Sequence, residues 1–235
     1  MIPLTETTFR RLSQSSPWRF TSLHFTWHPQ DPWFHSVEAW LTRPDRLRVR
    51  ALDGTERHVR EEREAPWMLS RDATGVLVAD PGHLVPPHGS PAERDEHGLV
   101  ITRPDDRWSG YDDPMWQTYT WVAMLDPREL ATGTTVDDLA QTERFGRATW
   151  WSQMSAVDES YEPRCGCCPL LWGQVSERAE AAAGGPTLAA REPDLVYPES
   201  WLIGLDVQTG VVVSAEPIGG SRLNAGFTLT IHEVG

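Results

Sequence analysis

The stretch that decides the fold reads Val37-Glu-Ala-Trp-Leu-Thr-Arg-Pro-Asp-Arg-Leu-Arg-Val-Arg-Ala51. Its first part alternates apolar and polar side chains, and the alternation resumes after the turn residues 43–45 with arginines on the polar side. A period of two predicts strands with one buried and one solvated face. The Pro-Asp pair between the two runs predicts a turn. We therefore expect two antiparallel strands, and we interpret the arginine face as solvated charge.

Upstream of this stretch, the apolar side chains change phase. Trp18 and Phe20 alternate in one phase, whereas the apolar residues of 23–27 alternate in the other. Such a slip predicts a bulge or a bend near Thr21-Ser22. The result would be a curved strand.

Further strands are expected on both sides of the middle of the chain. The hairpin turn Phe145-Gly146 joins two of them, and Gln208-Thr209-Gly210 joins another pair. No internal repeat or shift in composition divides the sequence, so residues 1–235 are expected to form a single, mainly β (α+β) domain. The remaining strands are predicted at 55–60, 65–70, 75–79, 135–143, 147–157, 201–207, 211–215 and 227–231.

Two helical segments and two long connections interrupt the strands. A helix is predicted at 5–15, opened by Thr5, and another at 113–125, where Asp113 is placed to cap and Pro114 to start the first turn. A short turn through Leu130 would follow. Residues 80–98 have no periodicity and predict a long loop. The connection of residues 158–200 is longer still, and its Ala-, Glu- and Gly-rich second half predicts a frayed helix or disorder.

The composition excludes two classes of partner. The 235 residues carry 34 acidic and 21 basic side chains, for a net charge of −13, and every basic one is arginine. Nucleic acid would be repelled by this balance. No apolar run approaches the ~18 residues that span a bilayer. The first residues lack the apolar core of a secretory signal, so we expect a cytoplasmic protein.

The order of these elements resembles the outer-membrane lipoprotein carrier superfamily, whose fold is called LolA-like. The resemblance rests on a helix, two long apolar strands, the segment Leu41-Thr-Arg-Pro-Asp-Arg-Leu-Arg-Val-Arg50, a helical cover, and a strand-turn-strand through Leu205-Asp-Val-Gln-Thr-Gly-Val211. It covers most of residues 1–157 and 201–234. It implies a curved, incompletely closed antiparallel β-barrel whose concave apolar face is covered by helices and binds acyl chains or other hydrophobic ligands.

One residue of the resemblance has a possible role, and several features depart from the family. An arginine before a proline tethers the helical lid in the carriers, and Arg43 matches that position; the alternative is an ordinary turn residue. The carriers' Asp-Gly-x-x-x-Trp hairpin is not evident. The cysteine-containing insertion is also foreign to them, and it resembles uncharacterised actinobacterial relatives with a Cys-x-Cys-Cys loop.

Twelve tryptophans are more than a core of this size requires. Tryptophan combines a large apolar body with one polar atom, so these residues either fill the core or line a ligand cavity. We take the second reading for a hydrophobic small molecule or an acyl chain. The predicted ligand-binding residues are Trp18, Phe20, Phe25, Trp27, Trp40, Arg43, Trp116, Trp121 and Trp150.

All three cysteines fall within four positions, in Arg164-Cys-Gly-Cys-Cys-Pro169. Cys165, Cys167 and Cys168 could supply three of the four ligands of a zinc ion, although no histidine has a matching spacing. Two of them could instead form a redox pair, with Arg164 favouring the thiolate. The third alternative is that small thiols let the loop pack tightly beneath the barrel.

The sequence lacks the signatures of the common enzyme classes. It has no Gly-rich phosphate loop, no Gly-x-Ser-x-Gly elbow and no His-Glu-x-x-His. We therefore expect no cofactor beyond a possible zinc ion, and a non-catalytic carrier or sensor that binds a hydrophobic or lipid-like ligand. The alternative is a thiol-redox or zinc-binding protein that uses the cysteine loop.

Overall fold

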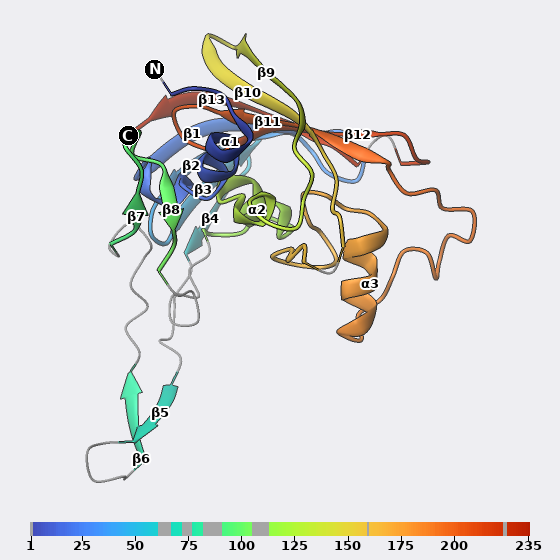
Figure 1. Ribbon diagram of the computed structural model, residues 1–235, viewed down its shortest axis with the longest axis horizontal. Coiled ribbons are helices and arrows are strands. Elements are labelled where there is room, and N and C mark those ends of the chain that lie inside the picture. Colours follow the sequence, from blue (N-terminus) through green and yellow to red (C-terminus); the bar gives the residue numbers. More distant parts are fainter. Residues whose placement is uncertain are drawn as a thin grey trace.

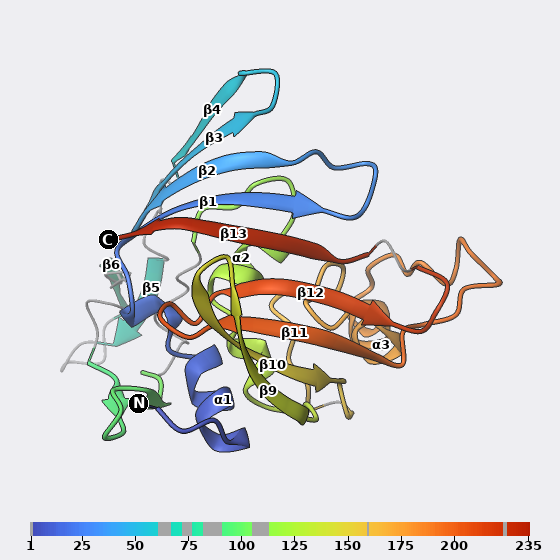
Figure 2. The ribbon, with the colours of Figure 1, turned by 90° about the horizontal axis from the view of Figure 1, so that it is seen from above.

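The computed structural model describes residues 2–60, 67–71, 77–81, 91–104, 113–158, 160–222 and 225–235. Its centre is a nine-stranded antiparallel sheet in the order β4-β3-β2-β1-β13-β12-β11-β10-β9 (Figure 2). Because β4 and β9 are its two edges, the sheet is not closed into a barrel. The strands are β1 Ser22–Pro29, β2 Val37–Thr42, β3 Arg46–Ala51, β4 Glu56–Arg60, β9 Asp137–Arg144, β10 Arg147–Met154, β11 Ser200–Asp206, β12 Val212–Ile218 and β13 Phe227–Val234.

The expected fold class is confirmed. The decisive hairpin forms in register, with Leu41 opposite Leu47 and Val37 opposite Ala51. The apolar residues of β1, β2 and β3 are buried at every second position, as the alternation predicts. The second half supplies the other side of the sheet through the hairpins β9-β10 and β11-β12. The sequence thus yields a mainly β protein with a large, open, antiparallel sheet.

Helices cover one face of this sheet (Figure 1). α1 (Glu6–Ser13) is preceded by Thr5, whose side-chain oxygen accepts a hydrogen bond from the N–H of Thr8 at 3.2 Å and so caps the helix. α2 (Thr120–Leu125) lies under the same face. α1 buries Phe9 and Leu12, and α2 buries Trp121 and its neighbours. Together they close the apolar core.

The predicted helix at 113–125 is wrong in its first half. Gln117 has φ 64°, in the left-handed region, where a helix cannot continue. Asp113 does not cap a helix, because it lies buried against Arg43. The helix therefore starts only at Thr120. The expected turn through Leu130 is present as a 3₁₀ helix, Arg128–Leu130.

The phase change upstream of β1 has a different origin from the predicted one. Residues Ser16–Trp18 form a 3₁₀ helix that begins around Pro17, so Trp18 and Phe20 are not part of a strand. The ladder does shift, but between His24 and Phe25, where β1 pairs with β13. The two apolar phases thus belong to two different elements.

The long connections contain more structure than their composition predicts. The strands β5 (Trp67–Arg71) and β6 (Leu77–Pro81) form one antiparallel pair, and β7 (Glu93–Arg94) and β8 (Val100–Thr102) form another. β7 lies inside the predicted loop 80–98, of which residues 82–90 are outside the described residues. The insertion 158–200 holds α3 (Gln174–Ala182). No helix in the described ranges is long and apolar enough to cross a membrane.

Candidate functional site

The predicted ligand-binding residues separate into several environments. Phe25, Trp121 and Trp150 are fully buried core side chains, with the ring of Trp121 5.4 Å from the rings of Phe25 and Trp27. The concave face is therefore filled by the chain's own side chains under α2. Trp116 packs against this core and is partly buried. The role of these residues as ligand contacts stays a prediction.

Trp40 lies on the opposite face of the sheet. It stacks on His24 with ring centroids 4.7 Å apart, and the Arg48 guanidinium lies 3.8 Å above its ring. Trp18 is half-buried, with the Arg103 guanidinium 5.3 Å from its ring. Both tryptophans are therefore engaged in cation–π contacts outside the concave core.

Arg43 lies at the centre of a buried polar network. Its guanidinium donates to both carboxylate oxygens of Asp113, at 2.8 and 2.7 Å, and to the carbonyl of Ser16 at 2.8 Å. It also reaches the carbonyl of Leu125, the last residue of α2, at 3.4 Å, and covers the ring of Phe20 at 3.8 Å. The residue thus links the hairpin turn, the N-terminal segment and α2, and is more than an ordinary turn residue.

A pocket of about 420 Å³ lies between the sheet and the insertion. Of the nine predicted residues, Trp27 alone lines it. The sheet contributes side chains of β1, β11, β12 and β13 to one wall, and the insertion contributes the cysteine loop and α3 to the other. We call this cavity the aromatic pocket. Its main apolar lining consists of Trp27, Phe34, Leu170, Trp172, Trp201 and Phe227.

The insertion is fixed over this end of the sheet by direct contacts. The indole N–H of Trp201 on β11 donates to the carbonyl of Trp172 at 2.9 Å. The buried carboxylate of Glu177 on α3 accepts from the N–H of Leu188 at 2.8 Å and from the hydroxyl of Tyr197 at 2.9 Å. These bonds hold α3 and the chain after it together, so the insertion is an ordered cover.

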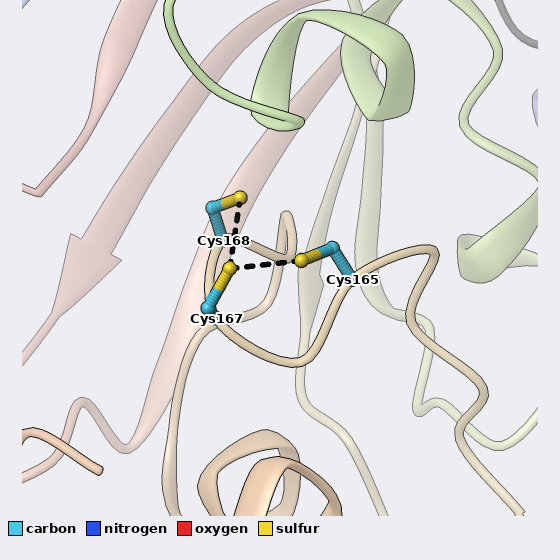
Figure 3. Close-up of side chains that lie close together, drawn as sticks. All are labelled: Cys165, Cys167 and Cys168. Carbon is cyan, nitrogen blue, oxygen red and sulfur yellow. Dashed lines mark hydrogen bonds between the residues drawn. The ribbon is translucent and has the colours of Figure 1, made fainter. Parts of the chain in front are cut away.

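The three thiols converge in the cysteine loop, next to the aromatic pocket (Figure 3). The Sγ atoms of Cys165 and Cys167 are 2.8 Å apart, and those of Cys167 and Cys168 are 3.5 Å apart. All three lie within 4.8 Å of one another. Cys167 and Cys168 belong to the pocket lining, so the ligand pocket and the cysteine loop expected from the sequence are parts of one site.

The thiols do not act as core filler. Cys167 is exposed and the other two are partly exposed, whereas Leu170 and Leu171 of the same segment are buried. Tight packing beneath the sheet is therefore the work of the leucines. Burial, together with the neighbouring sulfurs, raises the pKa of Cys168 well above its usual range, and burial likewise raises the pKa of Cys167.

Two buried carboxylates hold the cysteine loop in place. Glu129 accepts from the N–H of Arg164 at 3.0 Å and from the N–H of Leu170 at 2.7 Å, on either side of the cysteines. The hydroxyl of Tyr161 donates to the same carboxylate at 2.7 Å. Asp126 pairs with the guanidinium of Arg164 and, at 2.8 Å, with that of Arg103. The loop is thus closed at both ends.

The pKa values of the two carboxylates are shifted in opposite directions. Burial raises the pKa of Glu129, although the hydrogen bonds from Arg164, Tyr161 and Leu170 oppose that shift. Burial would also raise the pKa of Asp126, but the charges of Arg103 and Arg164 outweigh it and lower the pKa below its ordinary value. Asp126 therefore holds its two arginines as a carboxylate.

Sequence reasoning missed most of this site. Asp126 and Glu129 follow α2 and were interpreted only as the end of a helix and a short turn. Trp172 and Trp201 lie 29 residues apart in the chain, and only the folded insertion brings them together. The one available signal is the pair of acids in Asp126-Pro-Arg-Glu129, directly after an apolar helix, where buried acids need partners.

Comparisons with known proteins give little further identification. No family model matches the sequence, and no curated protein matches it. Among solved structures, the chain is similar to one described as the crystal structure of MucB, with a TM-score of 0.40 and 12% identity over 98% of this chain. The match spans 60% of the MucB chain, less than two thirds of its length. A likeness at this level says nothing of family or function.

Proposed function

We propose that the protein binds a small hydrophobic or amphipathic molecule in the aromatic pocket, without catalysis, as a carrier or sensor. The observation that carries the proposal is the pocket itself, a cavity of about 420 Å³ whose lining includes aromatic side chains of the sheet and of the insertion. Ligand sites in proteins are mostly apolar, with a few polar groups, and measure roughly 300–1,000 Å³. The site is at the lower end of this range, which favours a compact ligand or part of an acyl chain.

The lining also favours a ligand with a polar group. It includes the polar side chains of Asp31 and Arg191. Thr118, Thr120 and Glu180 add further polar side chains to the lining. An amphipathic molecule satisfies both the aromatic and the polar parts.

The proposal is tested by filling the pocket from two sides. Ala225 lies between β12 and β13, and Thr118 lies just before α2; both line the pocket and are partly exposed. Ala225→Phe and Thr118→Phe each place a ring in the cavity. The matched control is Ala140→Phe, at an exposed position of the edge strand β9. Binding of 11-(dansylamino)undecanoic acid is followed by its fluorescence.

We expect the wild-type protein and Ala140→Phe to bind the probe alike, and both filled variants to bind it at least about tenfold more weakly, a loss of about 1.4 kcal/mol. Native mass spectrometry of the protein purified from cells should show a lipid-sized adduct that the filled variants lack. Equal binding by all four proteins would refute the aromatic pocket as the site. Circular dichroism verifies that each variant is folded.

A further inference from the structure

We propose that Cys165, Cys167 and Cys168 form a zinc site in the wall of the aromatic pocket, with its fourth coordination position on the pocket side. The inference goes beyond the proposed function, because metal binding by the three thiolates does not require the amphipathic ligand. It rests on the convergence of the sulfurs, on the anchoring of their loop and on their exposure.

The sulfurs have nearly the spacing that one ion requires. Zinc bonds to thiolate sulfur at about 2.3 Å in tetrahedral sites, which separates neighbouring sulfurs by about 3.8 Å. The observed separations are 2.8 Å between Cys165 and Cys167 and 3.5 Å between Cys167 and Cys168, with all three Sγ atoms within 4.8 Å of one another. To meet one ion, the first pair of sulfurs must therefore move apart by about 1 Å and the second pair by about 0.3 Å.

The loop backbone is already fixed for such a site. The carboxylate of Glu129 holds the N–H groups of Arg164 and Leu170, which bracket the three cysteines. The carbonyl of Cys168 also accepts from the hydroxyl of Thr120 at 3.3 Å. An ordered loop pays less conformational entropy when it binds. Glu129 and Thr120, which are not metal ligands themselves, therefore hold the backbone of the three cysteines in place before a metal binds.

The chemistry of the donors selects the metal. Thiolates are soft ligands that favour Zn²⁺, Cu⁺ and iron–sulfur clusters over Mg²⁺ or Ca²⁺. Four-coordinate zinc accepts three protein ligands and an exchangeable fourth, the pattern of sites that meet a cavity. Because Cys167 and Cys168 line the aromatic pocket, the fourth position lies on that side.

A carboxylate stands close to the loop. Glu180 of α3 packs against Gly166, between Cys165 and Cys167, so closely that a Cβ at Gly166 would lie 2.6 Å from its Oε2 atom. Glu180 also lines the pocket. It thereby adds negative charge next to three thiols, an arrangement that a dication relieves. The Gly166 position keeps α3 and the cysteine loop in contact.

The experiment uses the full chain, reduced and freed of metal under anaerobic conditions. Cobalt(II) is the first probe, because tetrahedral cobalt–thiolate sites absorb strongly in the visible region and give a sulfur-to-metal charge-transfer band that grows with the number of thiolates. Competition with zinc and a chromophoric chelator then gives the zinc affinity. The variants are Cys165→Ser, Cys167→Ser and Cys168→Ser, with Glu180→Gln to test the carboxylate and Ala225→Phe as the pocket control.

We expect the wild-type protein to bind one equivalent of cobalt with a tetrahedral thiolate spectrum, and zinc to displace it. Each serine variant should bind zinc at least about tenfold more weakly and lose about a third of the charge-transfer intensity. Ala225→Phe should keep the metal while losing the dansyl probe, so failure of the zinc site and failure of the ligand proposal are distinguishable. Circular dichroism melts of the metal-free proteins should coincide.

Three results would overturn the proposal. The first is the absence of cobalt and zinc uptake by the reduced protein. The second is unchanged zinc affinity in all three serine variants. The third is binding of Cu⁺ alone, or oxidation to a Cys165–Cys167 disulfide as the only chemistry of the loop, either of which would replace zinc as its function.

Discussion

Replacing Glu129 by glutamine tests how the cysteine loop is held. The Glu129 carboxylate is buried and accepts three hydrogen bonds, from the N–H groups of Arg164 and Leu170 and from the hydroxyl of Tyr161. Glutamine has almost the same shape but offers one acceptor and one donor. Tyr161 and Leu170 share one oxygen, whereas Arg164 bonds to the other. The amide oxygen can serve the shared position, so the amide NH₂ must face the N–H of Arg164.

The magnitude follows from these contacts. The part-buried N–H of Arg164 is left without an acceptor, which costs about 1–3 kcal/mol, and the other two bonds lose their charge assistance at about 1 kcal/mol each. Against this, glutamine removes a charge whose burial is unfavourable, as the raised pKa of Glu129 shows. We therefore expect Glu129→Gln to lower the free energy of unfolding by about 1–3 kcal/mol.

Urea unfolding followed by circular dichroism measures this loss. Glu162→Gln is the matched control, because Glu162 is an exposed acid on the same segment. Hydrogen exchange should show faster exchange at the amides of Arg164 and Leu170 in Glu129→Gln alone. If the two variants differ by less than about 0.5 kcal/mol and protect these amides equally, the carboxylate does not hold the loop and the reasoning is refuted.

Three further predictions concern the buried charges and the loop. Arg43→Ala strands the buried Asp113 and should cost about 3–5 kcal/mol in urea unfolding, whereas Arg46→Ala, at an exposed end of the same turn, should change little; equal effects would contradict the network. The pKa of Asp126 is lowered from 3.8, so the stability that this carboxylate contributes is present above pH 3.8 and is lost as the pH falls through the lower pKa of the folded protein. Asp126→Asn should therefore reduce the fall of the melting temperature at acid pH. An unchanged fall would count against a stabilising role of the Asp126 carboxylate. Gly166→Ala would place a Cβ 2.6 Å from the Glu180 carboxylate and should weaken zinc binding in the chelator competition. An affinity equal to that of the wild type would show that the Glu180 side chain moves away without disturbing the cysteine loop.

The fold could be predicted because its signals are local. Alternating apolar residues locate the ends of the sheet strands within about three residues, and the hairpin at Phe145-Gly146 forms where both residues have positive φ. The half of the predicted helix before Thr120 failed for a tertiary reason. Asp113 has the form of a cap, but its carboxylate is paired with Arg43, 70 residues earlier in the chain. No local pattern contains that partner.

The ligand residues were harder to predict for the same reason. Tryptophan content indicates large apolar side chains but not which of them face a cavity, and α2 turns most of the concave face into core. Trp121 is an example. It lies on α2 and so has no place in the strand alternation, yet its ring contacts those of Phe25 and Trp27 on β1. Only at the end of the sheet covered by the insertion does Trp27 meet open space.

The position of the insertion explains why the ligand and metal hypotheses belong together. An open sheet leaves its concave face exposed at one end, and apolar residues such as Trp201 and Phe227 require a cover there. The insertion provides it with Leu170 and Leu171 turned into the core and the cysteines left at the pocket wall. The leucines of the insertion therefore close the core, whereas its cysteines stay next to the pocket. A molecule in the aromatic pocket and an ion on the thiols would each contact the same loop, so binding of one should alter the affinity for the other, equally in both directions.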